Sequence, residues 1–345
     1  MLVSDAMTRK AGRVADRSRW RSVLGLILSE YLVLALCVLY TLVMIPVVPE
    51  IATVEVWQNI LSDMMPLLIV CLGQTIVLII AGIDLSVTAI ISMASVVGAS
   101  IMTQSDGYLS GPLAAPAAMA AMLLLGAGIG LLNGLSITRL NMPAFVVTLA
   151  TTTFFGGSAI WYTTFHSTTT SIYDLPDMFI SIGDRDVGGV PIAVIIAVGA
   201  ALVVHGILAH TILGRWFYAV GKNPRTAYVS GVPVRSTIVA AFVLSGVLAA
   251  LASIVYTARL QTGTPILGER ILLDVVGAVV IGGTSLFGGK GKVIWTVFGV
   301  LFLVLIDTTL KLLGASLFAI YVIKGSVILA AALLDTLRTR YLGVR

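Results

Sequence analysis

The sequence predicts an all-α, polytopic membrane protein with about ten transmembrane helices. Hydrophobic residues make up 58% of its 345 residues, charged residues only 11%, and the mean hydropathy is +1.06. Soluble globular domains are nearer to roughly 45–50% apolar and about 25% charged, so these values exclude a water-soluble enzyme and a disordered chain. Glycine and proline, with 34 and 11 residues, are common in transmembrane helices.

Ten stretches approach the length of a spanning helix, which needs about 20 mostly apolar residues. We expect these helices at residues 23–45, 60–81, 85–103, 112–137, 143–164, 190–213, 237–257, 271–285, 293–313 and 317–334. They form one transmembrane domain over residues 23–335, between a basic tail at 1–22 and a short tail at 336–345. The first stretch is too long for a signal peptide, so we expect a retained helix.

The charges predict the orientation of these helices. With the N-terminus inside, the cytoplasmic segments hold 16 of the 21 basic residues. The opposite side holds three basic and ten acidic residues. The positive-inside rule therefore places both termini in the cytoplasm. With the first and sixth spans set aside, two groups of four remain that start on opposite sides, so a repeat between them would be inverted.

The chain lacks a phosphate-binding loop of its own. The run at 288–292 is too short for a G-x-x-x-x-G-K-[ST] motif, and no segment is long enough for a soluble nucleotide-binding domain. Any energy source must therefore be a partner subunit or an ion gradient. Cys37 and Cys71 lie in apolar stretches, and we expect two buried, unreactive thiols.

Two motifs concern the packing and capping of the expected spans. Asp84 follows Gly82 and is placed to cap the next helix, which we favour over a ligand contact. Two consecutive G-x-x-x-G steps predict close helix packing, within the chain in preference to a dimer seam. These glycines are Gly126, Gly130 and Gly134.

A row of threonines shares one helix face, because its members are three and four residues apart. These are Thr148, Thr151 and Thr152. Threonine hydroxyls in a span often bond back to their own helix, whereas hydroxyls facing a pore would suit a polar, uncharged solute. The pattern leaves both interpretations open, and we include the three as candidates for the substrate pathway.

The cytoplasmic segment 214–236 has the signals of a short helix. Asn223 is a suitable cap, Pro224 fits the first turn, and Gly231 fits the end. A solvated basic loop would hardly need the aromatic residues that this segment contains, so we expect it to dock on a partner. The aromatic residues are Trp216, Phe217, Tyr218 and Tyr228.

Five motifs, in this order along the chain, match those of a known family. They are Gly82-Ile83-Asp84-Leu85-Ser86, Asn133-Gly134, the stretch 141–149, Gly221-Lys222-Asn223-Pro224 with Ser230-Gly231, and Gly282-Gly283-Thr284-Ser285-Leu286 with Gly288-Gly289. From about residue 60 to Asp335 the chain resembles the permease subunit of ribose-type ABC importers, within the sugar and branched-chain amino-acid permease superfamily.

The resemblance implies a type II ABC-importer-like fold in the bacterial inner membrane. It also implies a second permease copy, forming a homodimer, a cytoplasmic ATPase subunit that binds ATP and Mg, and a periplasmic solute-binding protein. We expect no cofactor on this chain and no nucleic-acid partner. By the same resemblance, a coupling helix would contact the ATPase through Gly221, Asn223, Pro224, Arg225, Ser230 and Gly231.

One departure from the family concerns charges in the last two spans. Such permeases often carry paired asparagines in the ninth span, where this chain has Asp307, with Lys311 one turn later. Lys324 lies in the tenth span, where a basic residue is usual for the family. Charges in a span usually face an interior or a wet cavity, so a structural Asp307–Lys311 pair and a role in the substrate pathway both stay open.

We therefore expect a permease that moves a monosaccharide or related polyol and performs no covalent chemistry. One alternative is an amino-acid or nucleoside permease of the same class. Another is an ion-coupled secondary transporter with Asp307 as the coupling carboxylate. An intramembrane enzyme would need a nucleophile with a base, or a metal pair, and the sequence offers neither.

Overall fold

A computed structural model describes residues 32–166, 170–268 and 271–342. The expected basic tail at 1–22 and the beginning of the first expected span lie outside the described residues. Within them, one helix lies in each of the ten expected ranges, so the all-α class is confirmed. The helices are α2 (Leu32–Met44), α3 (Val54–Ile79), α4 (Val87–Met102), α5 (Ala114–Arg139), α6 (Ala144–Thr163), α8 (Ile192–His210), α11 (Val234–Leu260), α12 (Leu272–Gly282), α13 (Val293–Leu312) and α14 (Leu317–Leu342).

Length divides these helices into two sets. Among the described residues, six helices are long and apolar enough to cross a membrane, namely α3, α5, α6, α8, α11 and α13. Shorter apolar helices are α2, α4, α12 and the Leu317–Leu333 part of α14. Helix α14 continues to Leu342, beyond the span end expected at residue 334.

Several small elements lie between the apolar helices. They are the 3₁₀ turn η1 (Pro49–Ala52), α7 (Asp177–Asp184), the antiparallel strands β1 (Asp186–Val187) and β2 (Val190–Pro191), α9 (Ile212–Lys222) and α10 (Pro224–Val229). Helix α10 confirms the short helix that the sequence predicts after Asn223. The sequence predicted no ordered element between residues 164 and 190, so α7 and the hairpin are additions.

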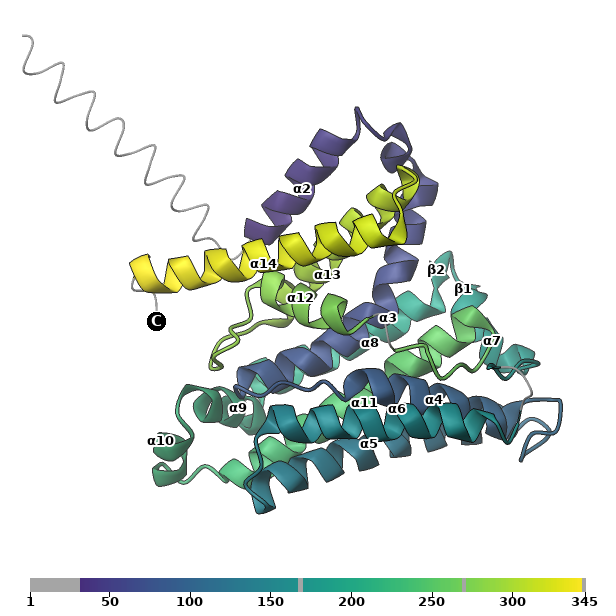
Figure 1. Ribbon diagram of the computed structural model, residues 1–345, viewed down its shortest axis with the longest axis horizontal. Helices are drawn as coiled ribbons and strands as arrows, with labels where there is room; N and C mark the ends of the chain where they lie inside the picture. The colour runs from purple at the N-terminus through teal and green to yellow at the C-terminus, as the bar shows by residue number, and fades with distance from the viewer. Residues whose placement is uncertain (1–31, 167–169, 269–270, 343–345) are drawn as a thin grey trace, which may run out of the picture.

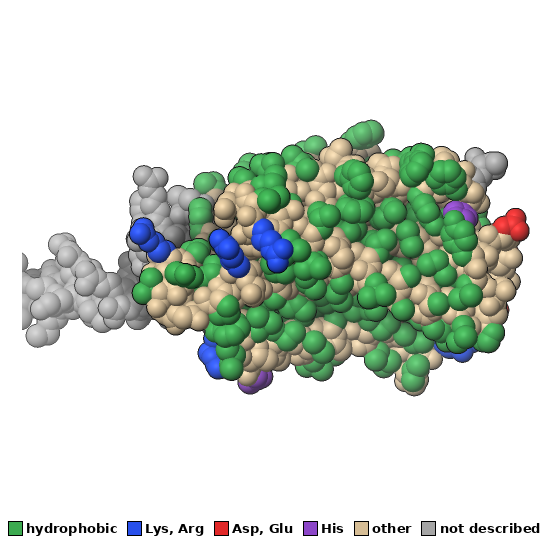
Figure 2. Space-filling model, turned by 90° about the horizontal axis from the view of Figure 1, so that it is seen from below, with side chains coloured by type: hydrophobic (Ala, Val, Ile, Leu, Met, Phe, Trp, Pro, Cys, Tyr) green, Lys and Arg blue, Asp and Glu red, His purple; other side chains and the backbone are tan. Residues whose placement is uncertain are grey.

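The long helices run roughly along the long axis of the molecule, and the loops gather at its two ends (Figure 1). One end carries α9, α10, the α12–α13 connection and the C-terminal end of α14. The other end carries α7, the hairpin and the α4–α5 connection. In Figure 2, lysine and arginine side chains gather at the α9–α10 end, and the middle of the visible face is mainly hydrophobic. This arrangement agrees with the orientation that the charges predict.

Helix α11 is the centre of the bundle and packs against α5, α3 and α4. The three glycines of α5 make its closest contact. A Cβ at Gly126 or Gly130 would overlap the backbone carbonyl of Gly246 or Phe242 on α11, and Gly134 lies against Val239. The glycines thus let two helices of the same chain approach closely, as such steps do in membranes.

The two groups of four helices pack in corresponding ways. In the first group, α4 packs against α5 and α6; in the second, α12 packs against α13 and α14. Across the groups, α11 packs on α4 and α5, while α3 packs on α12 and α13. The shortest helix of each group, α4 or α12, is the second of its four and occupies the same place among its neighbours.

Candidate functional site

A cavity of about 400 Å³ lies between α3, α11, α12, α13 and α14. Apolar side chains form part of its wall, with the aromatic ring of Tyr256. Three acidic and three basic side chains form the rest, so the formal charges of the lining cancel. These residues are Asp63, Asp274, Asp307, Arg259, Lys311 and Lys324.

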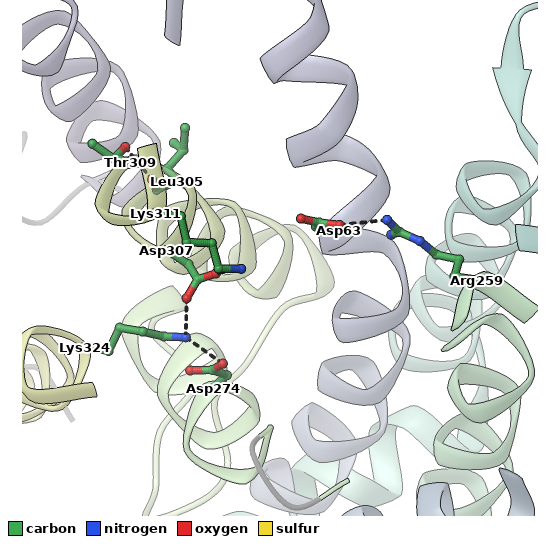
Figure 3. A network of polar contacts seen from close by, with 8 residues as sticks. All are labelled: Asp63, Arg259, Asp274, Leu305, Asp307, Thr309, Lys311 and Lys324. Atoms are coloured by element: carbon green, nitrogen blue, oxygen red, sulfur yellow. Dashed lines mark hydrogen bonds and ion pairs between the residues drawn. The ribbon is translucent and has the colours of Figure 1, made fainter. Parts of the chain in front are cut away.

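Lys324 joins three helices at this cavity. Its Nζ donates to Asp274 Oδ2 of α12 at 2.8 Å and to Asp307 Oδ1 of α13 at 3.1 Å (Figure 3). Only 7% of the lysine is exposed. A charge at membrane depth is costly unless it is paired, and two carboxylates offset the desolvation of this ammonium. The three residues therefore act as an ionic tie between α12, α13 and α14, which we call the outer network.

Lys311 extends the outer network along α13. Its Nζ lies 2.6 Å from Asp307 Oδ2, which confirms the i, i+4 pair that the sequence predicts. The Lys311 side chain is 57% exposed, whereas that of Lys324 is 9% exposed. Asp307 is thus shared between a buried cation and an exposed one, and the exposed pair contributes little to stability by itself.

A second ion pair lies across the cavity from the outer network (Figure 3). Arg259 near the end of α11 binds Asp63 of α3, with 2.8 Å between Nη2 and Oδ1. The guanidinium also donates to the backbone carbonyl of Ser62. This pair connects the central helix α11 to α3, so the cavity has an ionic contact on each of two walls.

The short length of α12 explains why Asp274 lies far from the ends of the molecule. Its 11 residues span about 16 Å, roughly half of the hydrocarbon core of a bilayer. Because Gly282 leads into the connection at the α9–α10 end, the first turn of α12 lies far from the opposite end. Asp274 is in that first turn, where the partial positive charge of a helix N-terminus favours a carboxylate.

Sequence reasoning anticipated only part of this site. It selected Asp307, Lys311 and Lys324, and the structure brings all three to one cavity. It missed Asp274 as a partner of Lys324, and it missed the Asp63–Arg259 pair. The signal for Asp274 was available, because a single carboxylate in the apolar run of α12 demands a buried cation.

The threonines lie elsewhere, on α6. Thr148, Thr151 and Thr152 each donate to the carbonyl four residues earlier, at 3.0, 2.8 and 2.7 Å. Thr148 and Thr151 are buried. The cavity lining does not include them. In this conformation their hydroxyls satisfy the backbone of α6.

Thr151 belongs to a second polar cluster, which we call the inner network. Its single hydroxyl proton is shared between the Val147 carbonyl and Asn133 Oδ1, which lies 2.7 Å from Thr151 Oγ1, and Asn133 Nδ2 donates to Ser86 Oγ at 2.8 Å. Ser86 Oγ donates to Asp84 Oδ1 at 2.6 Å, and Ser245 Oγ donates to Asp84 Oδ2 at 2.8 Å. Asp84 accepts from the N–H of Ser86, just before α4, instead of capping an N–H within the helix as expected.

The residues expected to couple to an ATPase form an ordered, capped turn of helix at one end of the molecule. The Asn223 side chain accepts from the N–H groups of Arg225 and Thr226 at 2.9 and 3.0 Å. Pro224 is the first residue of α10, and Gly231, with φ +82°, follows the Ser230 that ends it. Gly221 packs against the end of α3, where a Cβ would overlap the Ile79 carbonyl.

Comparison with known proteins adds an independent observation. A family model described as "Branched-chain amino acid transport system / permease component" matches residues 56–332. A ribose import permease of Haemophilus influenzae is 35% identical over 298 residues, covering 86% of this chain and 88% of the relative. The ribose import permease of Escherichia coli K12 is 36% identical over 287 residues, covering 83% and 87%. A D-allose permease of the same strain is 34% identical over 267 residues, covering 77% and 78%. No solved structure matches the chain.

Proposed function

The chain belongs to the branched-chain amino acid transport system / permease component family, and from this membership we propose that it is the membrane permease subunit of an ABC importer for a monosaccharide or related polyol. The observation that carries the proposal is the similarity to ribose and allose permeases over at least 77% of the chain. The chain is a transport subunit and not an enzyme. Since its sequence has no phosphate loop, ATP and Mg²⁺ would bind to a separate cytoplasmic ATPase subunit.

The cavity suits an uncharged, hydroxylated solute. Its formal charges cancel, so the lining favours neither a net anion nor a net cation. Carboxylates of Asp63, Asp274 and Asp307 can accept hydrogen bonds from sugar hydroxyls, and Lys311 can donate to them. The ring of Tyr256 offers an apolar surface beside these groups. Such a mixture of apolar walls and a few polar groups is usual for small-molecule sites.

The outer network supports a passage that changes shape. Three helices meet at Lys324, so a movement of α12 against α13 and α14 must lengthen at least one of its ion pairs. Outward-open and inward-open states would then differ in which charges are paired and which face the solute. ATP-driven closure of the partner subunits would bias the two states.

The α9–α10 end would face the cytoplasm and receive the ATPase. It carries the capped helix α10, and Tyr228 and Val229 on that helix are 73% and 82% exposed. We propose that the chain crosses the membrane ten times, with both termini in the cytoplasm. Its two groups of four helices would form an inverted repeat in a type II ABC-importer-like fold. Two copies of the chain, forming a homodimer, and a periplasmic solute-binding protein would complete the importer in the bacterial inner membrane.

Uptake into membrane vesicles that hold the complete importer tests this proposal. We expect uptake of labelled ribose or allose to require ATP inside the vesicle, the binding protein and the ATPase subunit. Uptake by the chain alone under a proton gradient would instead support the ion-coupled carrier. In that case Asp307→Asn should abolish proton coupling.

A second candidate, an amino-acid permease, rests on the presence of both charge signs in the cavity. A zwitterion could place its carboxylate near Lys311 and its ammonium near Asp63. Competition decides between the two, because unlabelled leucine in excess should leave sugar uptake unchanged if the sugar proposal holds. Unlabelled nucleoside in excess tests the nucleoside alternative in the same way, by its effect on sugar uptake.

A further inference from the structure

The α12–α13 connection, residues 283–292, is an ordered turn with no role in the transport mechanism proposed for the cavity. Ser285 N donates to the Lys290 carbonyl at 3.0 Å, and Gly288 N donates to the Ser285 carbonyl at 3.2 Å. Gly288 and Gly289 have φ of +82° and +71°, a region that other residues rarely adopt. The turn places Leu286 and Phe287 at its tip, and Phe287 is 78% exposed.

Direct contacts fix this loop to the end of α3 and to α9. Gly289 N donates to the Ile79 carbonyl at 2.8 Å, and the Tyr218 hydroxyl donates to the Gly291 carbonyl at 2.7 Å. Burial raises the pKa of the Tyr218 hydroxyl, so this group stays a donor. Gly221 allows the close approach, because a Cβ there would lie 2.6 Å from Gly289 N. Loop 283–292 and α9 therefore move together.

The loop and α10 present similar side chains at the same end of the molecule. Phe287 from the loop and Tyr228 and Val229 from α10 are all at least 73% exposed. Gly288, next to Phe287, packs on the Gly221 carbonyl, only three residues before α10 begins. Large apolar side chains exposed beside a basic, polar end of the protein indicate a binding surface.

The charges around these side chains have one sign. Residues 204–236 and 283–293 contain no aspartate or glutamate, but they contain six lysines and arginines. Two of these, Lys290 and Lys292, lie 5.7 and 5.1 Å from the Trp295 ring centre, so their charges stay at the base of the loop. Figure 2 shows basic side chains gathered at this end. A partner that fits has an apolar groove with an acidic rim.

We propose that loop 283–292 is a second contact with the ATPase subunit, beside α10, and that Phe287 is its apolar anchor. The inference rests on the proposed function, because that function supplies the partner. A phospholipid surface also attracts basic and aromatic residues, but it needs no fixed geometry between two segments. The hydrogen bonds of Gly289 and Gly291 do fix that geometry, which favours a folded protein as the occupant. Movement of the ATPase would then reach α12 and α13 directly through their connection.

A photo-crosslinking experiment on the complete complex in its own membrane tests the proposal. A benzoylphenylalanine replaces Phe287 on the loop, Val229 on α10 as a reference, or Phe318 on α14 as a control. Phe318 is 83% exposed but lies in the first turn of α14, the helix whose other end reaches the α9–α10 end (Figure 1). The ATPase is identified by 8-azido-ATP labelling and by mass. We expect the 287 and 229 probes to link to the ATPase and the 318 probe not to do so.

The outcomes separate the two proposals. A 229 probe that links to the ATPase, with a 287 probe that links only to lipid or to the permease, overturns the second contact and leaves the importer intact. Failure of both probes overturns the second contact and the docking of α10 together. In the same complex, Phe287→Ala should weaken ATPase binding by roughly tenfold, whereas Phe287→Leu should keep most of it. Equal binding of the wild type and Phe287→Ala would contradict the anchor role.

Discussion

The inner and outer networks occupy corresponding places in the two groups of four helices, yet their chemistry differs. Thr151 is the eighth residue of α6 and Lys324 the eighth of α14. Asn133 and Asp307 lie close to the ends of α5 and α13. Each network also has a carboxylate near the shortest helix of its group: Asp84, joined to Asn133 through Ser86, lies just before α4, and Asp274, which binds Lys324, lies in the first turn of α12. One group thus uses neutral donors where the other uses full charges.

The two networks also differ in their access to the cavity. In the inner network Asp84 and Asn133 are fully buried and bond to neutral partners. In the outer network the carboxylates face a cavity, and Asp307 is shared between two cations. The comparison teaches that a similar helix frame can hold a buried network of neutral donors in one group and a charged network that lines a cavity in the other.

The largest expected effect follows from removing the central cation of the outer network. Lys324→Met leaves Asp274 and Asp307 facing each other without a buried counter-charge. Breaking a buried pair in this way costs about 3–5 kcal/mol, so we expect a strong fall in melting temperature and loss of uptake. Lys311→Met is the matched control for the melting temperature, since its exposed ammonium pairs with Asp307 at 57% exposure. Equal effects of the two variants would contradict the central role of Lys324.

A smaller loss is expected when the inner network loses its carboxylate. Asp84→Ala leaves the Ser86 N–H and the hydroxyls of Ser86 and Ser245 without their acceptor, which costs about 2–3 kcal/mol. Asp84→Asn keeps one acceptor and should fall between this variant and the wild type. The melting temperatures of the two purified variants, compared with that of the wild type, measure both losses of stability. A normal melting temperature with altered solute selectivity would show that the inner network is also a solute site.

The contact between α5 and α11 should hold the inner network together, because Asn133 and Ser245 lie on these two helices. Gly130→Ala forces a Cβ into the Phe242 carbonyl and should cost about 2 kcal/mol. Gly128→Ala is the control, since its Cβ would enter open space. Comparable melting temperatures for the two variants would mean that the helices can separate without cost.

The smallest effect distinguishes the threonines of α6. Thr151→Val removes the donor to Asn133 and should cost about 1 kcal/mol. Thr152→Val removes only a bond to its own helix and should change stability by less than about 0.5 kcal/mol. Uptake should be nearly unchanged in both. A large fall in uptake without a fall in stability would place these hydroxyls in the pathway after all.

Local patterns in the sequence predicted much of the fold. Hydropathy and length located all ten apolar helices, and the Asn223-Pro224 pair located α10, because these signals act within a few residues. The i, i+4 spacing predicted the Asp307–Lys311 pair for the same reason. The hairpin at 186–191 was not predicted, since strands of two residues leave no periodic pattern in the sequence.

Contacts between distant residues could not be predicted. Lys324 and Asp274 are 50 positions apart, and Arg259 and Asp63 are 196 apart. Only the folded helices bring them to one cavity. The threonine spacing showed that Thr148, Thr151 and Thr152 share a face, but what that face meets depends on how α6 packs.

Thiol labelling of the outer cavity tests the central claim most directly. Leu267→Cys places a thiol in the cavity wall without touching an ion pair, and Thr151→Cys places one in the inner network. Both are made with Cys37 and Cys71 replaced by alanine. We predict that a membrane-impermeant maleimide labels residue 267 and that transported sugar slows this labelling, whereas residue 151 stays unlabelled. Labelling of residue 151 that sugar slows, with residue 267 unaffected, would contradict the account.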